Sequence, residues 1–246
     1  MGKSLGKKHL VLSFLGGAVF FSGVSFAATN VSNMNVTPNT EAIHFYHNGE
    51  AKTSSAQYNN NGTNVPQSFI YNGTTYVPIR HVGDLISQNV YWEGQQGTIS
   101  IGQPVVELKN SSGSAIGTVT LTQEDDGVLA KIDVSNLPPG KHGFHVHQSP
   151  ITGNDFETAG SHLNPTDSQH GHLNPEGAHL GDFRNLEVAA DGTAKVEMKL
   201  EGASLDKNSA SSILGASLII HADEDDEKTD PTGNSGGRIA GGNVPQ

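Results

Sequence analysis

Histidines are concentrated in one stretch of this 246-residue chain. Eight of the 12 histidines lie between residues 142 and 221, and six of these lie between residues 145 and 179. The side chains whose types and spacing could hold metal ions are His145, His147, His162, His170, His179, Asp182 and His221. On a strand, residues two apart point to the same face, so His145 and His147 can reach one ion. Because the chain has no cysteine, a metal must be held by imidazole and carboxylate, which suits zinc and copper.

Short strands must position these side chains. Alternating runs separated by turn residues recur over 105–109, 117–122, 128–134, 143–147, 194–200 and 217–221. Many short strands and few aromatic residues predict an all-β sandwich or barrel. Residues 148–185 and 222–237 show no periodicity, and loops of that length inside a compact domain are usually functional.

The first 27 residues read as a secretory signal peptide. Three lysines precede an apolar run over residues 10–21, and the small-residue pattern that follows places cleavage after Ala27 or close by. An uncleaved membrane anchor is the alternative, but the run is short for a spanning helix. We therefore expect a secreted or envelope-associated, bacterial-type protein without stable membrane insertion after signal removal.

Two further zones precede the strand-rich region. Residues 28–66 are rich in Asn, Thr and Ser and predict a flexible or partly ordered segment. In residues 67–103, short strands flank a helix predicted over 79–86, and Asn72-Gly73 predicts a hairpin turn.

The pattern YVPIR at 76–80 followed by VYWEG at 90–94 resembles the copper amine oxidase N-terminal-like domain, a small α+β stalk module. This module could begin as early as residue 35. Its histidines, His44, His47 and His81, are scattered without metal-ligand spacing. We interpret it as a spacer or a module that lies near a cell wall.

The charge balance excludes some partners. The chain carries a formal net charge of −11, and residues 104–246 hold nine Lys and Arg against 21 Asp and Glu, which gives 9 − 21 = −12. Nucleic acid and anionic lipid are therefore poor partners. Acidity of this size is also an ordinary means to solubility, so it assigns no function by itself.

Four motifs in the last part of the chain resemble copper,zinc superoxide dismutases in both order and spacing. They are GFHVH at 143–147, GSHLNP at 160–165, HLGD at 179–182 and GNSGGR at 233–238. The intervals of eight, nine and three residues that link His162, His170, His179 and Asp182 also match that family. The resemblance covers about residues 105–244 and implies a Greek-key β-barrel domain over 104–246.

The resemblance implies two metals and one reaction. The implied copper ligands are His145, His147, His162 and His221, and the implied zinc ligands are His162, His170, His179 and Asp182. His162 would bridge both ions as an imidazolate during dismutation of the superoxide anion to dioxygen and hydrogen peroxide.

Three further positions complete the implied site. Asp225 would hydrogen-bond a copper ligand and a zinc ligand together, and Arg238 would guide the superoxide anion. His172 competes with His170 for the zinc position, and the eight-residue interval favours His170.

The family's usual disulfide is absent. The positions that would hold its two cysteines are Phe156 and Gly241. Such a bond commonly contributes about 2 to 5 kcal/mol in small secreted domains, so we expect the metal-carrying loop to depend on metal binding. A metal store without turnover and an adhesion scaffold are the alternative functions, and a homodimer and cell-wall association stay open.

Overall fold

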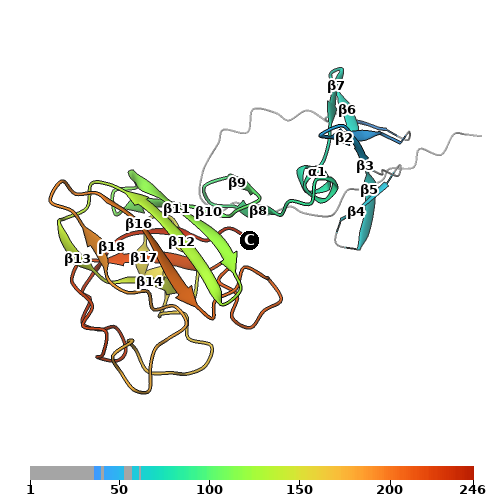
Figure 1. Ribbon diagram of the computed structural model, residues 1–246. Helices are drawn as coiled ribbons and strands as arrows, with labels where there is room; N and C mark the ends of the chain where they lie inside the picture. Colours follow the sequence, from blue (N-terminus) through green and yellow to red (C-terminus); the bar gives the residue numbers. More distant parts are fainter. Residues whose placement is uncertain (1–35, 40–41, 53–56, 61) are drawn as a thin grey trace, which may run out of the picture.

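The computed structural model describes residues 36–39, 42–52, 57–60 and 62–246 (Figure 1). The predicted signal peptide, residues 1–27, lies outside the described residues. In the described part of the chain, no helix has the length and apolarity needed to cross a membrane.

In the described residues before position 104, the chain forms short hairpins and one helix. These elements are β1 (Thr37–Pro38), β2 (Phe45–His47), β3 (Glu50–Lys52), β4 (Gln57–Asn60), β5 (Thr63–Pro66), β6 (Phe69–Tyr71), β7 (Thr74–Tyr76), α1 (Ile79–Leu85), β8 (Val90–Glu93) and β9 (Thr98–Ile101). The predicted helix is present and ends one residue earlier than expected. The predicted turn is also confirmed, because Asn72 and Gly73 both have positive φ angles and join β6 to β7.

Strands also form where the sequence predicted mostly loop. Strands β4 and β5 pair with each other over residues 57–66, and Gly62 N donates a hydrogen bond to Asn59 Oδ1 at the turn. Most residues of this hairpin are exposed. With no buried face, the hairpin leaves no alternating apolar pattern in the sequence.

The C-terminal region is a curled antiparallel sheet, which confirms the all-β Greek-key prediction (Figure 1). Its elements are β10 (Val105–Asn110), β11 (Ala115–Glu124), β12 (Gly127–Val134), β13 (Gly140–His142), β14 (Phe144–His147), the 3-10 helix η1 (Phe156–Ala159), β15 (Leu186–Val188), β16 (Ala194–Glu201), β17 (Ser217–His221) and β18 (Arg238–Asn243). The seven-stranded sheet has the order β14-β17-β18-β10-β11-β12-β16, and β13 pairs with β15. All six predicted strands are present.

Strand β18 lies in the middle of this sheet although the sequence did not predict it. Gly241 and Gly242 weaken its strand signal. Glycine is needed at position 241, because a Cβ atom there would lie 2.7 Å from Ile219 Cδ1 and 2.8 Å from Ile151 Cδ1. Close packing between the sheet and a loop therefore requires glycine at position 241, although glycine has a low propensity for strands.

Alternating apolar side chains fill the interior of the barrel. Val128, Ala130 and Ile132 of β12 are fully buried, as expected for one face of a strand. Phe144 and Phe183 stack with their ring centroids 4.8 Å apart. This core fixes β14, the strand that carries two of the candidate ligands.

The long loop between β14 and β15 covers the free edge of β14. Val146 N donates to Gly181 O, and Leu163 N donates to Val146 O, each at 2.8 Å. These bonds satisfy backbone groups that an open sheet edge would leave unpaired. They also place the histidines of the loop beside those of the strand.

Candidate metal centre

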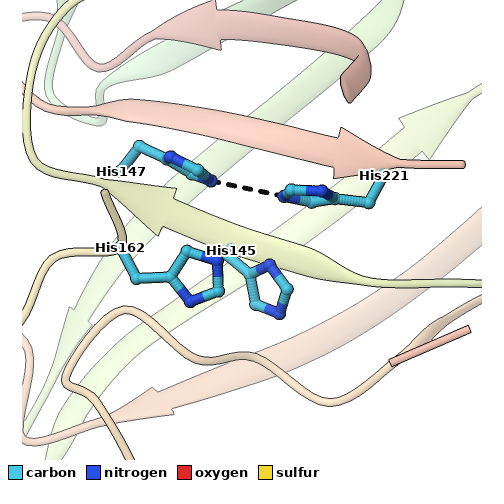
Figure 2. Close-up of side chains that lie close together, drawn as sticks. All are labelled: His145, His147, His162 and His221. Carbon is cyan, nitrogen blue, oxygen red and sulfur yellow. Dashed lines mark hydrogen bonds between the residues drawn. The ribbon is translucent and has the colours of Figure 1, made fainter. Parts of the chain in front are cut away.

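The first group of candidate ligands consists of four buried histidines, His145, His147, His162 and His221, which we call the histidine set (Figure 2). Figure 2 shows His145 and His147 on β14 and His221 at the end of the neighbouring strand β17. Their potential ligand atoms all lie within 4.8 Å of one another. The Nε2 atoms of His147 and His221 are 3.3 Å apart, so both lone pairs point into one small space.

The second group combines three histidines with one carboxylate: His162, His170, His179 and Asp182, which we call the mixed set. Asp182 Oδ1 lies 2.9 Å from His162 Nδ1 and 3.3 Å from His179 Nδ1. His170 Nδ1 lies 3.0 Å from Asp182 Oδ2. His162 belongs to both sets, and its Nδ1 is the nitrogen that lies beside Asp182.

Asp225 connects the two sets from the side. Its carboxylate lies 2.7 Å from His145 Nε2 and 3.0 Å from His170 Nε2. Asn185 holds the Asp225 backbone, because its amide donates to Asp225 O and its Oδ1 accepts from Asp225 N, both at 2.8 Å. A carboxylate in this position fixes the orientation of both imidazole rings.

The ring nitrogens of the candidate ligands divide into held and free atoms. His145 Nδ1 and His162 Nε2 are buried and have no hydrogen-bond partner among the described residues, whereas His170 Nδ1 faces the carboxylate of Asp182 at 3.0 Å. The opposite nitrogens of His145 and His170 face Asp225. The Nδ1 atoms of His147 and His221 face the carbonyl oxygens of Gly160 and Gly236 at 2.8 and 3.1 Å.

This division of nitrogens fits bound metal ions. Buried polar atoms normally have partners, so the two free nitrogens of the histidine set, on His145 and His162, fit a site that holds an ion. Metal-binding histidines typically use their second nitrogen to bond a carboxylate or a carbonyl. The donor types present, imidazole and carboxylate, suit copper and zinc.

Burial controls the protonation of the histidine set. It lowers the pKa of His145 to about 3 and that of His221 to about 4. Burial also lowers the pKa values of His147 and His162. These rings are therefore neutral near pH 7, and neutral imidazole is the form that binds metals.

Carboxylates give the mixed set a different electrostatic character. Burial alone would lower the pKa of His170, but its interactions with Asp182 and Asp225 raise that pKa to about 9. Although burial opposes it, hydrogen bonds from histidines hold the pKa of each aspartate well below its usual value. Two buried anions around His170 therefore favour a positive charge there, and a metal cation can replace the proton.

Arg238 lies at the mouth of the centre. Its Nη1 donates to Phe156 O at 2.5 Å and its Nη2 donates to Gly160 O at 2.6 Å. A cavity of about 270 Å³ is bounded by Arg238 together with His147, His162 and His221. A small anion in this cavity would meet both the guanidinium group and the histidine set.

The competing residue His172 lies outside both sets. Its Nε2 is 2.7 Å from Asp182 O, a backbone contact that positions the loop. The structure brings together the nine residues singled out from the sequence: His145, His147, His162, His170, His179, Asp182, His221, Asp225 and Arg238.

Sequence reasoning missed several groups that hold these ligands. The carbonyl oxygens of Gly160 and Gly236 hold His147 and His221 but give no side-chain signal. Asp230 Oδ1 accepts a hydrogen bond from His170 N at 2.8 Å. Its place eight residues before Arg238, in an acidic loop, was the only available hint.

The histidines of the N-terminal region form no comparable group within the described residues. His81 is buried and packs against the rings of Phe45 and Tyr58, with centroids 5.7 and 4.7 Å away. The three ligand groups found in the described part of the chain all lie in the barrel. The scattered N-terminal histidines therefore agree with packing and surface roles.

A Greek-key barrel with two ligand sets that share one histidine defines a class of dinuclear metalloprotein. The family model for copper/zinc superoxide dismutase matches residues 115–244. The chain belongs to the copper/zinc superoxide dismutase family. A copper amine oxidase N-terminal domain model matches residues 57–136, which confirms the second resemblance and overlaps the first match.

Curated relatives and solved structures agree with this assignment. The chain is 40% identical over 143 residues to superoxide dismutase [Cu-Zn] 1 of Aquifex aeolicus, which covers 56% of this chain and 85% of the relative. It is 43% identical to the superoxide dismutase-like protein YojM of Bacillus subtilis, of which it covers 73%. A crystal structure of a SOD-like protein from Bacillus subtilis has 40% identity and a TM-score of 0.55, and the match covers 57% of this chain and 97% of that chain.

Proposed function

We propose that the histidine set holds copper, that the mixed set holds zinc, and that the protein dismutates superoxide to dioxygen and hydrogen peroxide. Copper and zinc are the metals of the family to which the chain belongs. Bound copper would supply reversible one-electron chemistry, whereas zinc is redox-inert and would have a structural and electrostatic role. The dinuclear assignment rests on one observation: two groups of four buried residues, each with its potential ligand atoms within 4.8 Å of one another, share His162.

His162 is the residue that we propose to handle a proton. Its Nδ1 lies beside Asp182, and its Nε2 has no hydrogen-bond partner among the described residues. Two superoxide anions and two protons give one dioxygen and one hydrogen peroxide. We propose that His162 Nε2 holds one of these protons and delivers it to the product.

Arg238 is proposed to attract and orient the substrate. The domain is acidic, so its average field repels superoxide, but a local positive potential in a cleft can still focus an anion. Two carbonyl oxygens fix the guanidinium at the edge of the cavity beside the histidines. The remaining guanidinium surface is the positive group that an entering anion would meet.

The test is a measurement of superoxide decay with purified protein loaded with copper and zinc. The unaltered protein should accelerate decay catalytically. His145→Ala should reduce this activity beyond the roughly 10- to 100-fold effect typical of residues that only support a ligand. Activity that survives loss of His145 would overturn the mechanism, and metal binding without turnover would identify a metal store instead.

We also propose that the protein is exported. The N-terminal sequence pattern supports export, and one relative, 38% identical over 149 residues, is an extracellular superoxide dismutase [Cu-Zn] of Brugia pahangi. The N-terminal region, with residues 67–103 as its proposed stalk module, could then serve as a spacer near the cell wall. Comparing the mass and N-terminal sequence of secreted protein with the encoded chain tests cleavage near Ala27.

A further inference from the structure

The loop between β14 and β15, which carries the mixed set and is called the metal loop below, includes Phe156. Phe156 belongs to a small apolar cluster. Ile151, Phe156, Ala159 and Ile219 are buried together, separate from the main core. Phe156 and Gly241 occupy the two positions where the family resemblance implies cysteines. Glycine at position 241 leaves room for the side chains of Ile151 and Ile219. Apolar side-chain contacts therefore lie where the family resemblance implies a disulfide.

Asn243, the last residue of β18, forms hydrogen bonds with both the N–H group and the carbonyl group of one loop residue, Ile151. Its Oδ1 accepts from Ile151 N at 2.7 Å, and its Nδ2 donates to Ile151 O at 3.1 Å. The Asn243 residue is only 6% exposed. Its carboxamide thus pairs with Ile151 as a neighbouring strand would.

Glu93 of β8 holds Asn243 in turn. Its Oε1 accepts from Asn243 Nδ2 at 3.3 Å and from Gln95 N at 3.0 Å, and its Oε2 accepts from Gln96 N at 2.6 Å. The Glu93 residue is 7% exposed, and a buried carboxylate is tolerated only when donors satisfy it. Glu93 therefore shapes the hairpin turn and reaches across 150 residues of sequence to the barrel.

The β8–β9 hairpin makes two further contacts with the barrel. Trp92 N donates to Gln246 O at 2.8 Å, and Gln246 N donates to Trp92 O at 3.1 Å, a reciprocal backbone pair. Gln95 Oε1 accepts from Gly153 N at 3.1 Å. The hairpin thus holds both the C-terminal end of the barrel and the metal loop.

The loop that Asn243 binds also carries the two carbonyl groups that accept hydrogen bonds from Arg238. Phe156 O and Gly160 O, which accept hydrogen bonds from the guanidinium group, lie five and nine residues after Ile151. Displacement of Ile151 and its apolar neighbours would move both carbonyl oxygens. The position of Arg238 therefore depends on contacts made by a hairpin outside the barrel.

We propose that the β8–β9 hairpin is an intramolecular brace for the metal loop and that Asn243 is a positioning residue that acts through this loop on Arg238. The brace joins the hairpin to the loop through Glu93, Asn243 and Gln95. It performs by non-covalent contacts the task that a disulfide would perform. Only its effect on substrate guidance rests on the proposed function.

Hydrogen exchange of the metal-loaded full chain tests the brace without reference to activity. Asn243→Leu removes every bond of the carboxamide at similar volume. It should raise exchange of the Ile151 and Gly153 amides about tenfold or more. Asn208→Leu is the matched control, because Asn208 is exposed and its side chain donates a hydrogen bond to the nearby Asp206 rather than to the loop.

A milder variant keeps the test decisive if Asn243→Leu does not fold. Gln95→Ala alters an exposed side chain and removes the acceptor of Gly153 N. It should raise exchange of the Gly153 amide several-fold and leave the Ile151 amide protected. Unchanged exchange at Gly153 in Gln95→Ala, or at Ile151 in folded Asn243→Leu, would overturn the brace.

A double-mutant cycle tests whether Asn243 acts through Arg238. Asn243→Leu should lower the rate of superoxide decay several-fold in the unaltered background and cause no further loss in the Arg238→Ala background. Equal losses in both backgrounds would overturn the positioning role. If the unaltered protein showed no dismutation, the proposed function would fail, and the exchange result alone would decide the brace.

Discussion

Three of the four residues in the histidine set, His145, His147 and His221, lie on strands β14 and β17, whereas the mixed set lies entirely in the loop between residues 148 and 185. The barrel core fixes the strand residues. Hydrogen bonds to Asp182 and Asp225 fix the loop residues, and both carboxylates are buried.

One domain therefore positions its candidate ligands in two ways. The histidine set is neutral, and its geometry follows from the sheet. The mixed set concentrates negative charge, so we expect a bound cation to stabilise its loop. We therefore expect the two sets to respond differently to metal removal and to substitution.

Metal removal should have the largest effect on the protein. A ligand present at about 1,000 times its Kd stabilises the folded state by about 4 kcal/mol, so chelation should lower the melting temperature by about 10 °C or more. Exchange of the Gly171 and His179 amides, which donate to Asp182 Oδ2, should rise more than exchange within β12. A shift of only a degree or two would show that the loop does not depend on metal.

Asp225→Asn should weaken metal binding by both sets, because Asp225 contacts His145 and His170. Loss of a carboxylate that orients metal ligands typically costs about 10- to 100-fold in metal affinity or activity. Competition with chelators measures each affinity, and zinc should be released more readily than copper. Glu224→Gln is the control, because Glu224 is exposed and pairs with Lys141.

If Asp225→Asn left both affinities unchanged, the link between the two sets would be structurally present and energetically unimportant. If copper were lost and zinc retained, the histidine set would depend on Asp225 more strongly than the mixed set does. That second result would reverse the comparison.

Arg238→Ala should have the smallest effect on the metals and a clear effect on turnover. Because Arg238 contacts two backbone carbonyl groups and borders the cavity, we expect about a tenfold loss of activity with weaker dependence on ionic strength. Lys195→Ala is the control, since Lys195 pairs with Asp133 on the exposed surface. Equal losses in the two variants would argue against substrate guidance.

The sequence predicted the strands and the candidate ligands because both leave periodic or spaced signals. Alternation in residues 128–134 predicted β12 directly. The intervals between His162, His170, His179 and Asp182 singled out the loop ligands, although those residues are far from the strand histidines in sequence.

The remaining features depend on contacts that carry no local signal. Strand β18 contains paired glycines because Ile151 and Ile219 need the space beside Gly241 and the neighbouring strand β10 leaves no room for a Cβ atom at Gly242. The backbone carbonyl groups that hold His147, His221 and Arg238 are present at every residue and cannot be singled out from sequence. The contact between Glu93 and Asn243 joins residues 150 positions apart, so only the folded chain brings them together.

Metal counting in single-residue variants tests the shared-histidine arrangement most directly. Native mass spectrometry of protein loaded with copper and zinc should show one ion of each metal per chain. His145→Ala should lose copper and keep zinc, His170→Ala should lose zinc and keep copper, and His162→Ala should weaken the binding of both. Full retention of both metals in His162→Ala, or loss of zinc alone in His145→Ala, would contradict two sets that share one histidine.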